Sequence, residues 1–525
     1  MAGGQIMKSM AVVSFWTMAS RLLGFAREVL MAVVFGTSLA SSAFVVAFTI
    51  PNLFRRLFGE GALSAAFIPV FTETREKEGD SVAWQLANRI WSLLAVVLSS
   101  VVLLAIGGIT LWFTRDVPNP EPDTVLVLSL LRIMFPYMVC ICMVALAMAV
   151  LNSCDHYMTS AATPTILNII WILTLLFACP QFGDTLDAQI HGVAWGVLFA
   201  GVVQVLLQLP ALARQGYRPS FTFRWSDERS RRVLVLMAPV ALGLGITQVN
   251  VMVDRLLAMH VADWAPAAIN YADRLIYLPL GIFATAMGTV LLPTFSRQNV
   301  QDDAGAVLQT LNNSLRHLML IMIPASVGLF VLATPIVQLV YMWPDKAFDS
   351  YSAMLTGRAL MLYAPGLLVF SLYKVVTPAF YAMQDTKTPV IVAAWVVGIN
   401  LSVNMLIVFT DVIDQEWKHA ALAGSTVFSS LISSVVLASI LHRRIGNPDW
   451  GRIVGSMGRA LLCACLMGVV AAAVYSALPG GDKPSQALAI GAAIAAGVIV
   501  YFVLCLGLCR AELREIRQGL RRKQT

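Results

Sequence analysis

Long apolar runs follow one another along the whole chain, separated by short polar stretches. A helix of about 20 apolar residues crosses the ~30 Å hydrocarbon core of a bilayer, and each run reaches about that length. The pattern therefore predicts an all-α polytopic membrane protein with about fourteen transmembrane helices. The predicted spans lie near residues 10–35, 38–58, 84–114, 124–152, 161–180, 190–213, 232–261, 266–294, 315–342, 352–380, 388–411, 419–442, 452–478 and 485–509.

Lysine and arginine gather in alternate loops, as they do on the cytoplasmic side of membrane proteins. The basic loops hold, among others, Arg75, Lys77, Arg214, Arg229, Arg297 and Arg443. The opposite loops are comparatively acidic, and the chain ends in a basic tail. We therefore expect an even number of spans, with both termini in the cytoplasm.

The composition excludes an ordinary soluble protein. Of the 525 residues, 58% are hydrophobic and 12% are charged, and the mean hydropathy is +0.77, whereas soluble domains are roughly half apolar and a quarter charged. The net charge of +7 is explained by the topology and gives no reason to expect a nucleic-acid partner. The eight cysteines lie mostly inside apolar runs, so we interpret them as small buried hydrophobic residues.

An internal repeat relates the two halves of the chain. Three short motifs recur in the same order and at a nearly constant offset. They are Ile68-Pro69 with Leu292-Pro293, Thr163-Pro164 with Thr388-Pro389, and His191 with His419. Parallel six-span repeats of this kind, with a site between them, are a transporter architecture. We predict an N-terminal lobe at 1–228, a C-terminal lobe at 229–447, two additional spans at 448–510 and a basic cytoplasmic tail at 511–525.

Charged residues lie inside the first two spans, where each costs roughly 2.5–3.5 kcal/mol unless it faces a polar cavity or a partner. Arg21 and Glu28 share one face of the first span, whereas Arg27 lies about a third of a turn away. We therefore expect Arg27 and Glu28 not to pair closely. Arg55 and Arg56 stand at the end of the second span. Either these residues line a cationic interior, or they form structural ion pairs and ordinary positive helix ends.

The second repeat carries its own charges, with Asp254 and Arg255 in the seventh span and Arg274 at the start of the eighth. Arginines from both repeats suit an anionic substrate, because guanidinium groups fit phosphate better than ammonium groups do. Asp254 either holds an arginine or binds a cation. For Asp385, between the tenth and eleventh spans, a loop or helix-cap role is the alternative to lining the site.

Enzyme motifs are lacking. The sequence contains no HExxH, no P-loop and no GxSxG motif. We therefore expect a transporter and not an enzyme. Because a P-loop is missing, this chain by itself is not an ATP-driven pump, and transport would draw on an ion gradient, the membrane potential or the substrate gradient.

Several stretches resemble the MurJ (MviN) family of bacterial lipid II flippases, within the MOP transporter superfamily. They are SRLLGFARE, then FVVAFTIPNLFRRLFGEGALSAAFIPVF, and later YADRL and LLPTFSR. The resemblance extends over essentially the full chain. It implies two six-helix lobes plus two C-terminal helices, and movement of lipid II from the inner to the outer leaflet of the bacterial plasma (inner) membrane for cell-wall synthesis.

The resemblance also implies which residues act. The substrate-binding candidates are Arg21, Arg27, Arg55 and Arg274, with Glu28, Arg56 and Arg255 as weaker ones. The last two spans are implied to form a groove for the polyprenyl tail. Membrane lipids and the cell-wall synthesis machinery are the implied partners besides lipid II.

Coupling to a sodium ion or to the membrane potential is implied as well, with Asp254 and Asp385 as candidate metal ligands and no other cofactor. The chain departs from the family at a few positions. Tyr381 stands one turn before Asp385, where a polar ligand is expected, and Ser42 and Thr49 replace an acidic residue and a lysine. These departures leave the arginine set intact.

Two rival functions stay open at this point. One is export of a related polysaccharide-linked lipid by a member of the same superfamily. The other is a membrane scaffold or sensor that binds lipid II without moving it. Turnover across a bilayer separates a transporter from a scaffold.

Overall fold

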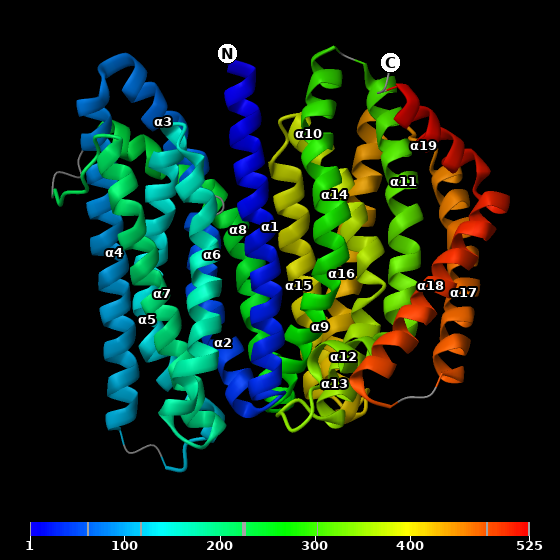
Figure 1. Ribbon diagram of the computed structural model, residues 1–525. Coiled ribbons are helices and arrows are strands. Elements are labelled where there is room, and N and C mark those ends of the chain that lie inside the picture. Colours follow the sequence, from blue (N-terminus) through cyan, green and yellow to red (C-terminus); the bar gives the residue numbers. More distant parts are fainter. Residues whose placement is uncertain are drawn as a thin grey trace. The chain divides into compact units, whose positions relative to one another are not determined.

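The computed structural model describes residues 2–59, 62–115, 118–222, 227–301, 303–478 and 481–522. Within these ranges every regular element is a helix, which confirms the predicted all-α class (Figure 1). The physical reason is that a helix satisfies its backbone N–H and C=O groups internally, as a chain in lipid must.

Packing divides the chain into two compact units, Met1–Met259 and His260–Thr525. The first unit contains α1 (Ala2–Phe35), α2 (Leu39–Phe54), the π-helix η1 (Arg55–Gly59), α3 (Ala62–Glu78), α4 (Asp80–Thr114), α5 (Pro122–Ser153), α6 (Tyr157–Leu173), the short η2 (Thr174–Ala178) and η3 (Cys179–Phe182), α7 (Leu186–Arg214) and nearly all of α8 (Glu228–Val261).

The second unit also consists of helices alone in its described part. It contains α9 (Ala265–Pro279), the π-helix η4 (Leu280–Ala284), α10 (Thr285–Val300), α11 (Ala304–Val331), α12 (Ala333–Tyr341), α13 (Ser350–Tyr363), α14 (Gly366–Ala382), α15 (Lys387–Phe409), α16 (Gln415–Ile445), α17 (Trp450–Ala477), α18 (Lys483–Leu508) and α19 (Arg510–Arg522).

The number of membrane spans is roughly consistent with the predicted fourteen. Among the described residues, eleven helices are long and apolar enough to cross a membrane, and the pair α13 and α14, bent by 43°, adds a twelfth. These twelve coincide with predicted spans three to fourteen. The first two predicted spans correspond to α1 and to α2 with η1. Charged residues set α1 apart from the other spans, and its length of 16 residues sets α2 apart.

The internal repeat appears in the secondary structure of each unit. The π-helix η1 follows α2 and the π-helix η4 follows α9, each a short way before one of the repeated prolines, Pro69 and Pro293. His191 in α7 contacts the hydroxyl of Ser129 through Nε2 at 3.0 Å, and His419 in α16 contacts the carbonyl of Leu355 through Nε2 at 2.9 Å. Each repeated histidine thus bonds to a neighbouring helix, α5 in the first unit and α13 in the second.

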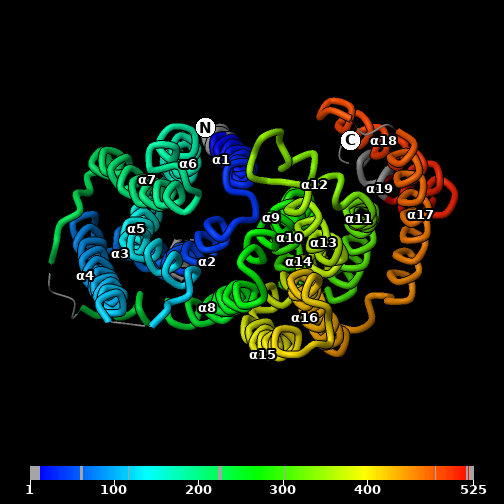
Figure 2. Tube along the Cα trace, turned by 90° about the horizontal axis from the view of Figure 1, so that it is seen from below, coloured from blue at the N-terminus to red at the C-terminus, as the bar shows by residue number. Residues whose placement is uncertain are grey.

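Helix α5 forms the core of the first unit. Figure 2 shows α2, α3, α4 and α7 around it, and each of these helices packs against it. Close approach of α7 depends on Gly201, because a Cβ there would lie 2.6 Å from the Tyr137 ring. In the second unit, α14 packs against α10, α11 and α16.

The packing boundary differs from the lobe boundary that we predicted at residue 228. The repeat assigns α8 to the second lobe, whereas α8 groups with the first unit up to Met259. Polar contacts join α8 to other elements of this unit: Arg229 pairs with Glu78 of α3, and Arg56 of η1 donates to Gln248. The predicted tail 511–525 is helical up to Arg522, and its last three residues lie outside the described part.

Candidate functional site

Arg27 of α1 lies against α6, and two α6 side chains fix its guanidinium group. Nη1 donates to Asn168 Oδ1 at 3.1 Å, and Cζ lies 4.2 Å from the centroid of the Trp171 ring. A guanidinium over an indole face gains roughly 0.5–2 kcal/mol, more as water is excluded. The side chain of Arg27 is 13% exposed. Its position is therefore set by α6.

Asn168 connects the same two helices a second time. Its Nδ2 donates to the Ser20 carbonyl at 3.0 Å, so that both ends of the amide are used. Gly24 faces the amide of Asn168, and a Cβ there would lie in ordinary contact with Nδ2, at 3.5 Å. Trp171 is held in turn by edge-on contacts with Phe44 and Phe48 of α2. Arg27 therefore lies in a prearranged amide and aromatic frame.

Glu28 forms an ion pair with Arg27, at 2.5 Å between Oε1 and Nη2. Our expectation that these neighbours do not pair closely was wrong. The two Cβ atoms diverge around the helix, as the expectation assumed, but the long arginine side chain places its guanidinium within reach of the carboxylate. Glu28 is buried, and the pair as a whole is neutral.

Three other candidate arginines of the first unit lie on η1 and on α1. Arg55 and Arg56 lie in the π-helix η1, where Arg55 Nε donates to Asn52 Oδ1 at 2.9 Å and Arg56 Nη1 donates to Gln248 Oε1 at 3.2 Å. Arg21 is exposed on α1. The π-helix widens the turn at this point, and such turns are frequent at functional sites.

Asp254 and Arg255 lie near the end of α8, still within the first unit. Asp254 Oδ2 accepts a hydrogen bond from Asn250 Nδ2 at 3.1 Å, one turn earlier on the same helix. Arg255 is buried. Arg274, the candidate of the second unit, is half-buried on α9, shortly before the π-helix η4.

Asp385 acts at the start of α15, in the second unit. Its Oδ1 accepts the Thr388 backbone N–H at 2.9 Å, and its Oδ2 accepts the Thr388 hydroxyl and pairs with Arg444. These hydrogen bonds, those from Thr388 foremost, hold the pKa of Asp385 at about 2, below its ordinary value. These contacts tie Asp385 to the first turn of α15, as expected for the helix-cap role that the sequence offered as the alternative to lining the site.

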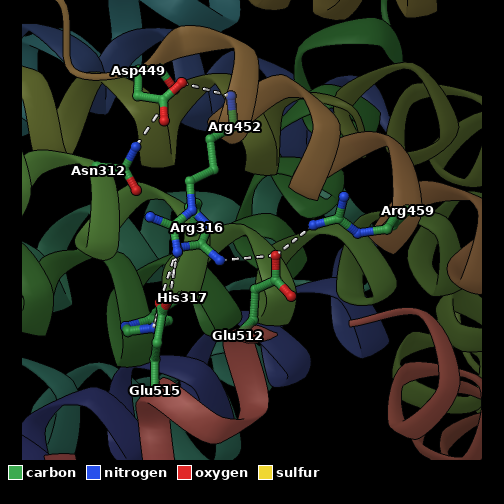
Figure 3. A network of polar contacts seen from close by, with 8 residues as sticks. All are labelled: Asn312, Arg316, His317, Asp449, Arg452, Arg459, Glu512 and Glu515. Atoms are coloured by element: carbon green, nitrogen blue, oxygen red, sulfur yellow. Dashed lines mark hydrogen bonds and ion pairs between the residues drawn. The ribbon is translucent and has the colours of Figure 1, made fainter. Parts of the chain in front are cut away.

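A further charged cluster escaped the sequence reasoning altogether (Figure 3). Arg316 of α11, 1% exposed, donates to Glu512 at 2.9 Å and to Glu515 at 2.9 Å on α19. Arg459 and Arg452 of α17 donate to the same two carboxylates, each at 2.7 Å. An arginine inside the apolar run 304–331 was the available signal, because such a charge requires a partner.

The residues that fix Arg27 were missed too. Asn168 and Trp171 are uncharged and lie in an unremarkable apolar run, so nothing in the sequence distinguishes them from packing residues. They become visible only once α6 lies against α1.

Comparison with known proteins places the chain in a family. The model of the family described as "Lipid II flippase MurJ" matches residues 31–485. The chain belongs to the MurJ family. The resemblance seen in the sequence is thereby confirmed.

Two relatives illustrate the extent of the similarity. A protein of Rhizobium meliloti named "Probable lipid II flippase MurJ" is 31% identical, over 98% of this chain and 96% of its own length. The "Lipid II flippase MurJ" of Burkholderia cenocepacia is 33% identical, over 88% of this chain and 89% of its own length.

Solved structures share the fold. A MurJ lipid II flippase in an inward closed conformation superposes with a TM-score of 0.77 at 23% identity, covering 94% of this chain and 98% of that one. An inward-facing MATE-family multidrug transporter of the MOP superfamily gives 0.66 at 13% identity, covering 83% and 98%. The fold of this MurJ-family chain is therefore that of the MOP superfamily.

Proposed function

We propose that this protein flips lipid II from the inner to the outer leaflet of the bacterial plasma membrane by alternating access, and so supports cell-wall synthesis. Membership of the MurJ family supports the proposal, as do relatives that carry the name lipid II flippase and align over nearly the whole chain. The activity is transport and not covalent catalysis, in keeping with the lack of enzyme motifs.

The observation that carries the proposal in this chain is the frame around Arg27. Lipid II presents a pyrophosphate, and a guanidinium binds phosphate oxygens through parallel N–H donors. Trp171 and Asn168 hold the guanidinium plane of Arg27 in place, while Glu28 pairs with Nη2. In the proposed mechanism the pyrophosphate replaces Glu28 as the anionic partner of Arg27, and the buried Glu28 carboxylate takes up a proton as it loses the guanidinium, so that neither a buried cation nor a buried anion is left uncompensated.

The remaining arginines complete the proposal. Arg21 and Arg55 in the first unit, and Arg274 in the second, are assigned to the pyrophosphate and headgroup. Arg56, Arg255 and Glu28 have supporting roles. We place both termini in the cytoplasm, with α17 and α18 accommodating the polyprenyl tail and the cell-wall synthesis machinery as partner.

A sodium ion or the membrane potential drives the cycle in this proposal. Asp254 and Asp385 are the two candidate sodium ligands, and Asp385 would have to give up its pairing with Arg444 to bind the ion. Removing sodium at fixed potential, and imposing a potential at fixed sodium, separate the two driving forces.

The test is outward translocation of labelled lipid II in sealed proteoliposomes. Arg27→Ala and Arg27→Lys are compared with the unchanged protein and with Arg443→Ala, a matched control because Arg443 is exposed near the end of α16. We expect translocation to be abolished by Arg27→Ala and strongly reduced by Arg27→Lys, because an ammonium lacks the planar fork. Arg443→Ala should remain active.

Three results would count against the proposal. Full activity of Arg27→Ala would remove Arg27 from the site. Tight binding of lipid II without translocation, at any potential, would instead favour a scaffold or sensor. Faster transport of a polyprenyl-linked polysaccharide precursor than of lipid II would favour the related exporter.

A further inference from the structure

Three cysteine thiols meet where α18 ends and α19 begins. Cys463 belongs to α17, Cys505 to the last turn of α18, and Cys509 to the junction with α19. Their three Sγ atoms all lie within 4.8 Å of one another. The Cys509 N–H donates to the Cys505 carbonyl at 2.9 Å, which continues the helical turn and keeps the two thiols on one face.

All three side chains are buried, with exposed fractions of 2% or less. They share an apolar cluster with Met319 of α11 and with alanine, leucine and isoleucine side chains, and Met457 packs against it. Tyr501 also packs there, but its hydroxyl already donates to the Leu320 carbonyl at 2.8 Å. The atoms at this place that could bind a metal ion are therefore mainly sulfur atoms.

We propose that Cys463, Cys505 and Cys509 form a binding site for one soft monovalent metal ion, Cu(I). Thiolate and thioether ligands select soft ions. Ligand sulfurs about 2.3 Å from a central metal ion lie roughly 3.8–4.6 Å apart, so the observed spacing needs only a small contraction.

Ligand number favours Cu(I) over zinc, because structural zinc sites use four ligands and three thiols meet here. Binding as thiolate releases one proton from each thiol that loses it, and Cu(I) with two thiolates and one neutral thiol carries one negative charge. The neighbouring cluster of Figure 3 contains three guanidiniums (Arg316, Arg452, Arg459) and three carboxylates (Asp449, Glu512, Glu515), so it adds no net formal charge beside the site.

This site lies in the two spans outside the internal repeat, and the inference does not depend on what the protein transports. The test uses the purified full-length protein in detergent, reduced and without oxygen, in competition with the coloured Cu(I) complex of bicinchoninate. The main variant is C463A/C505A/C509A. The matched control is C140A/C142A/C179A, which removes three thiols from the first unit.

We expect the unchanged protein and the control each to take up about one Cu(I) per chain and to gain thermal stability with it. The triple variant at the proposed site should do neither. C463S, the smallest single change, should weaken Cu(I) binding by about tenfold or more, and it keeps the test decisive if the triple variant fails to fold.

The proposal would be overturned if the unchanged protein left Cu(I) with the probe, or if C463S and the triple variant bound it as tightly as the unchanged protein does. Displacement of Cu(I) by equimolar Zn(II) would overturn the assignment to a soft monovalent ion.

Discussion

Replacing Glu512 by glutamine removes one negative charge from the contact that holds α19 against α11 and α17. Glu512 is fully buried, and its Oε1 accepts hydrogen bonds from Arg316 at 2.9 Å and from Arg459 at 2.7 Å. Glutamine keeps the size of the side chain and one acceptor oxygen. The substitution therefore isolates the charge.

The free-energy cost of the substitution depends on which ionic partner Arg316 keeps. Breaking a buried ion pair costs about 3–5 kcal/mol when the remaining charge has no other partner. Arg316 keeps Glu515, whose side chain is 29% exposed and hence partly screened by water. We therefore expect a cost of about 2 kcal/mol for the docking of α19, which corresponds to roughly a 30-fold change in its opening equilibrium.

Hydrogen exchange of the backbone amides in α19, followed by mass spectrometry, measures this opening directly. Glu512→Gln should speed exchange in α19 by about 30-fold and leave α17 and α18 nearly unchanged. Glu515→Gln is the matched control, since the same chemical change at a partly exposed position should cost less than about 1 kcal/mol. Equal exchange rates in the two variants would refute the reasoning, because burial would then not decide the strength of the contact.

Three further outcomes can be measured with the same preparations. Asn168→Leu should lower lipid II translocation by about tenfold without loss of folded protein, because Arg27 loses the amide that positions it; unchanged translocation would mean that Trp171 alone suffices. Asp254→Asn should abolish any sodium dependence of transport, whereas Asp385→Asn should retain it; the reverse result would restore Asp385 as a ligand. Acid should weaken the docking of α19 against α11 and α17. Burial alone raises the pKa of Glu512, but the hydrogen bonds from Arg316 and Arg459 outweigh this effect and hold the pKa at about 2, below the usual 4.5. The carboxylate thus stabilises the docking of α19 fully above about pH 4.5, and this stabilisation is lost as the pH falls toward 2. Hydrogen exchange in α19, corrected for its intrinsic pH dependence, should therefore become faster over that range. The increase should be smaller in Glu512→Gln.

The sequence by itself determined the helices and their duplication. Hydropathy is a property of contiguous residues, and a helix in lipid must satisfy its own backbone, so apolar runs translate directly into spans. The π-helices η1, η2 and η4, which lie within or at the end of three of the predicted spans, could be recognised only from the structure. Motifs recurring at a nearly constant offset predicted the repeat that η1 and η4 display.

The positions of charged residues in the sequence predicted their side-chain contacts less well than hydropathy predicted the helices. The angular separation of neighbours on a helix argued against an Arg27–Glu28 pair, yet the flexible arginine side chain makes it. Asp385 was offered two roles, and the structure shows it bonded to the first turn of α15 and paired with Arg444. In both cases the sequence specified the residues but not the rotamers that join them.

Tertiary structure decided which distant residues meet. Arg27 and Asn168 are 141 residues apart, and Arg316 and Glu512 are 196 residues apart. The three thiols likewise come from two helices and a junction. No local pattern encodes these contacts, because they depend on which faces of separate helices pack together. Hydropathy fixes that a helix crosses the membrane, and packing of side chains fixes what that helix touches.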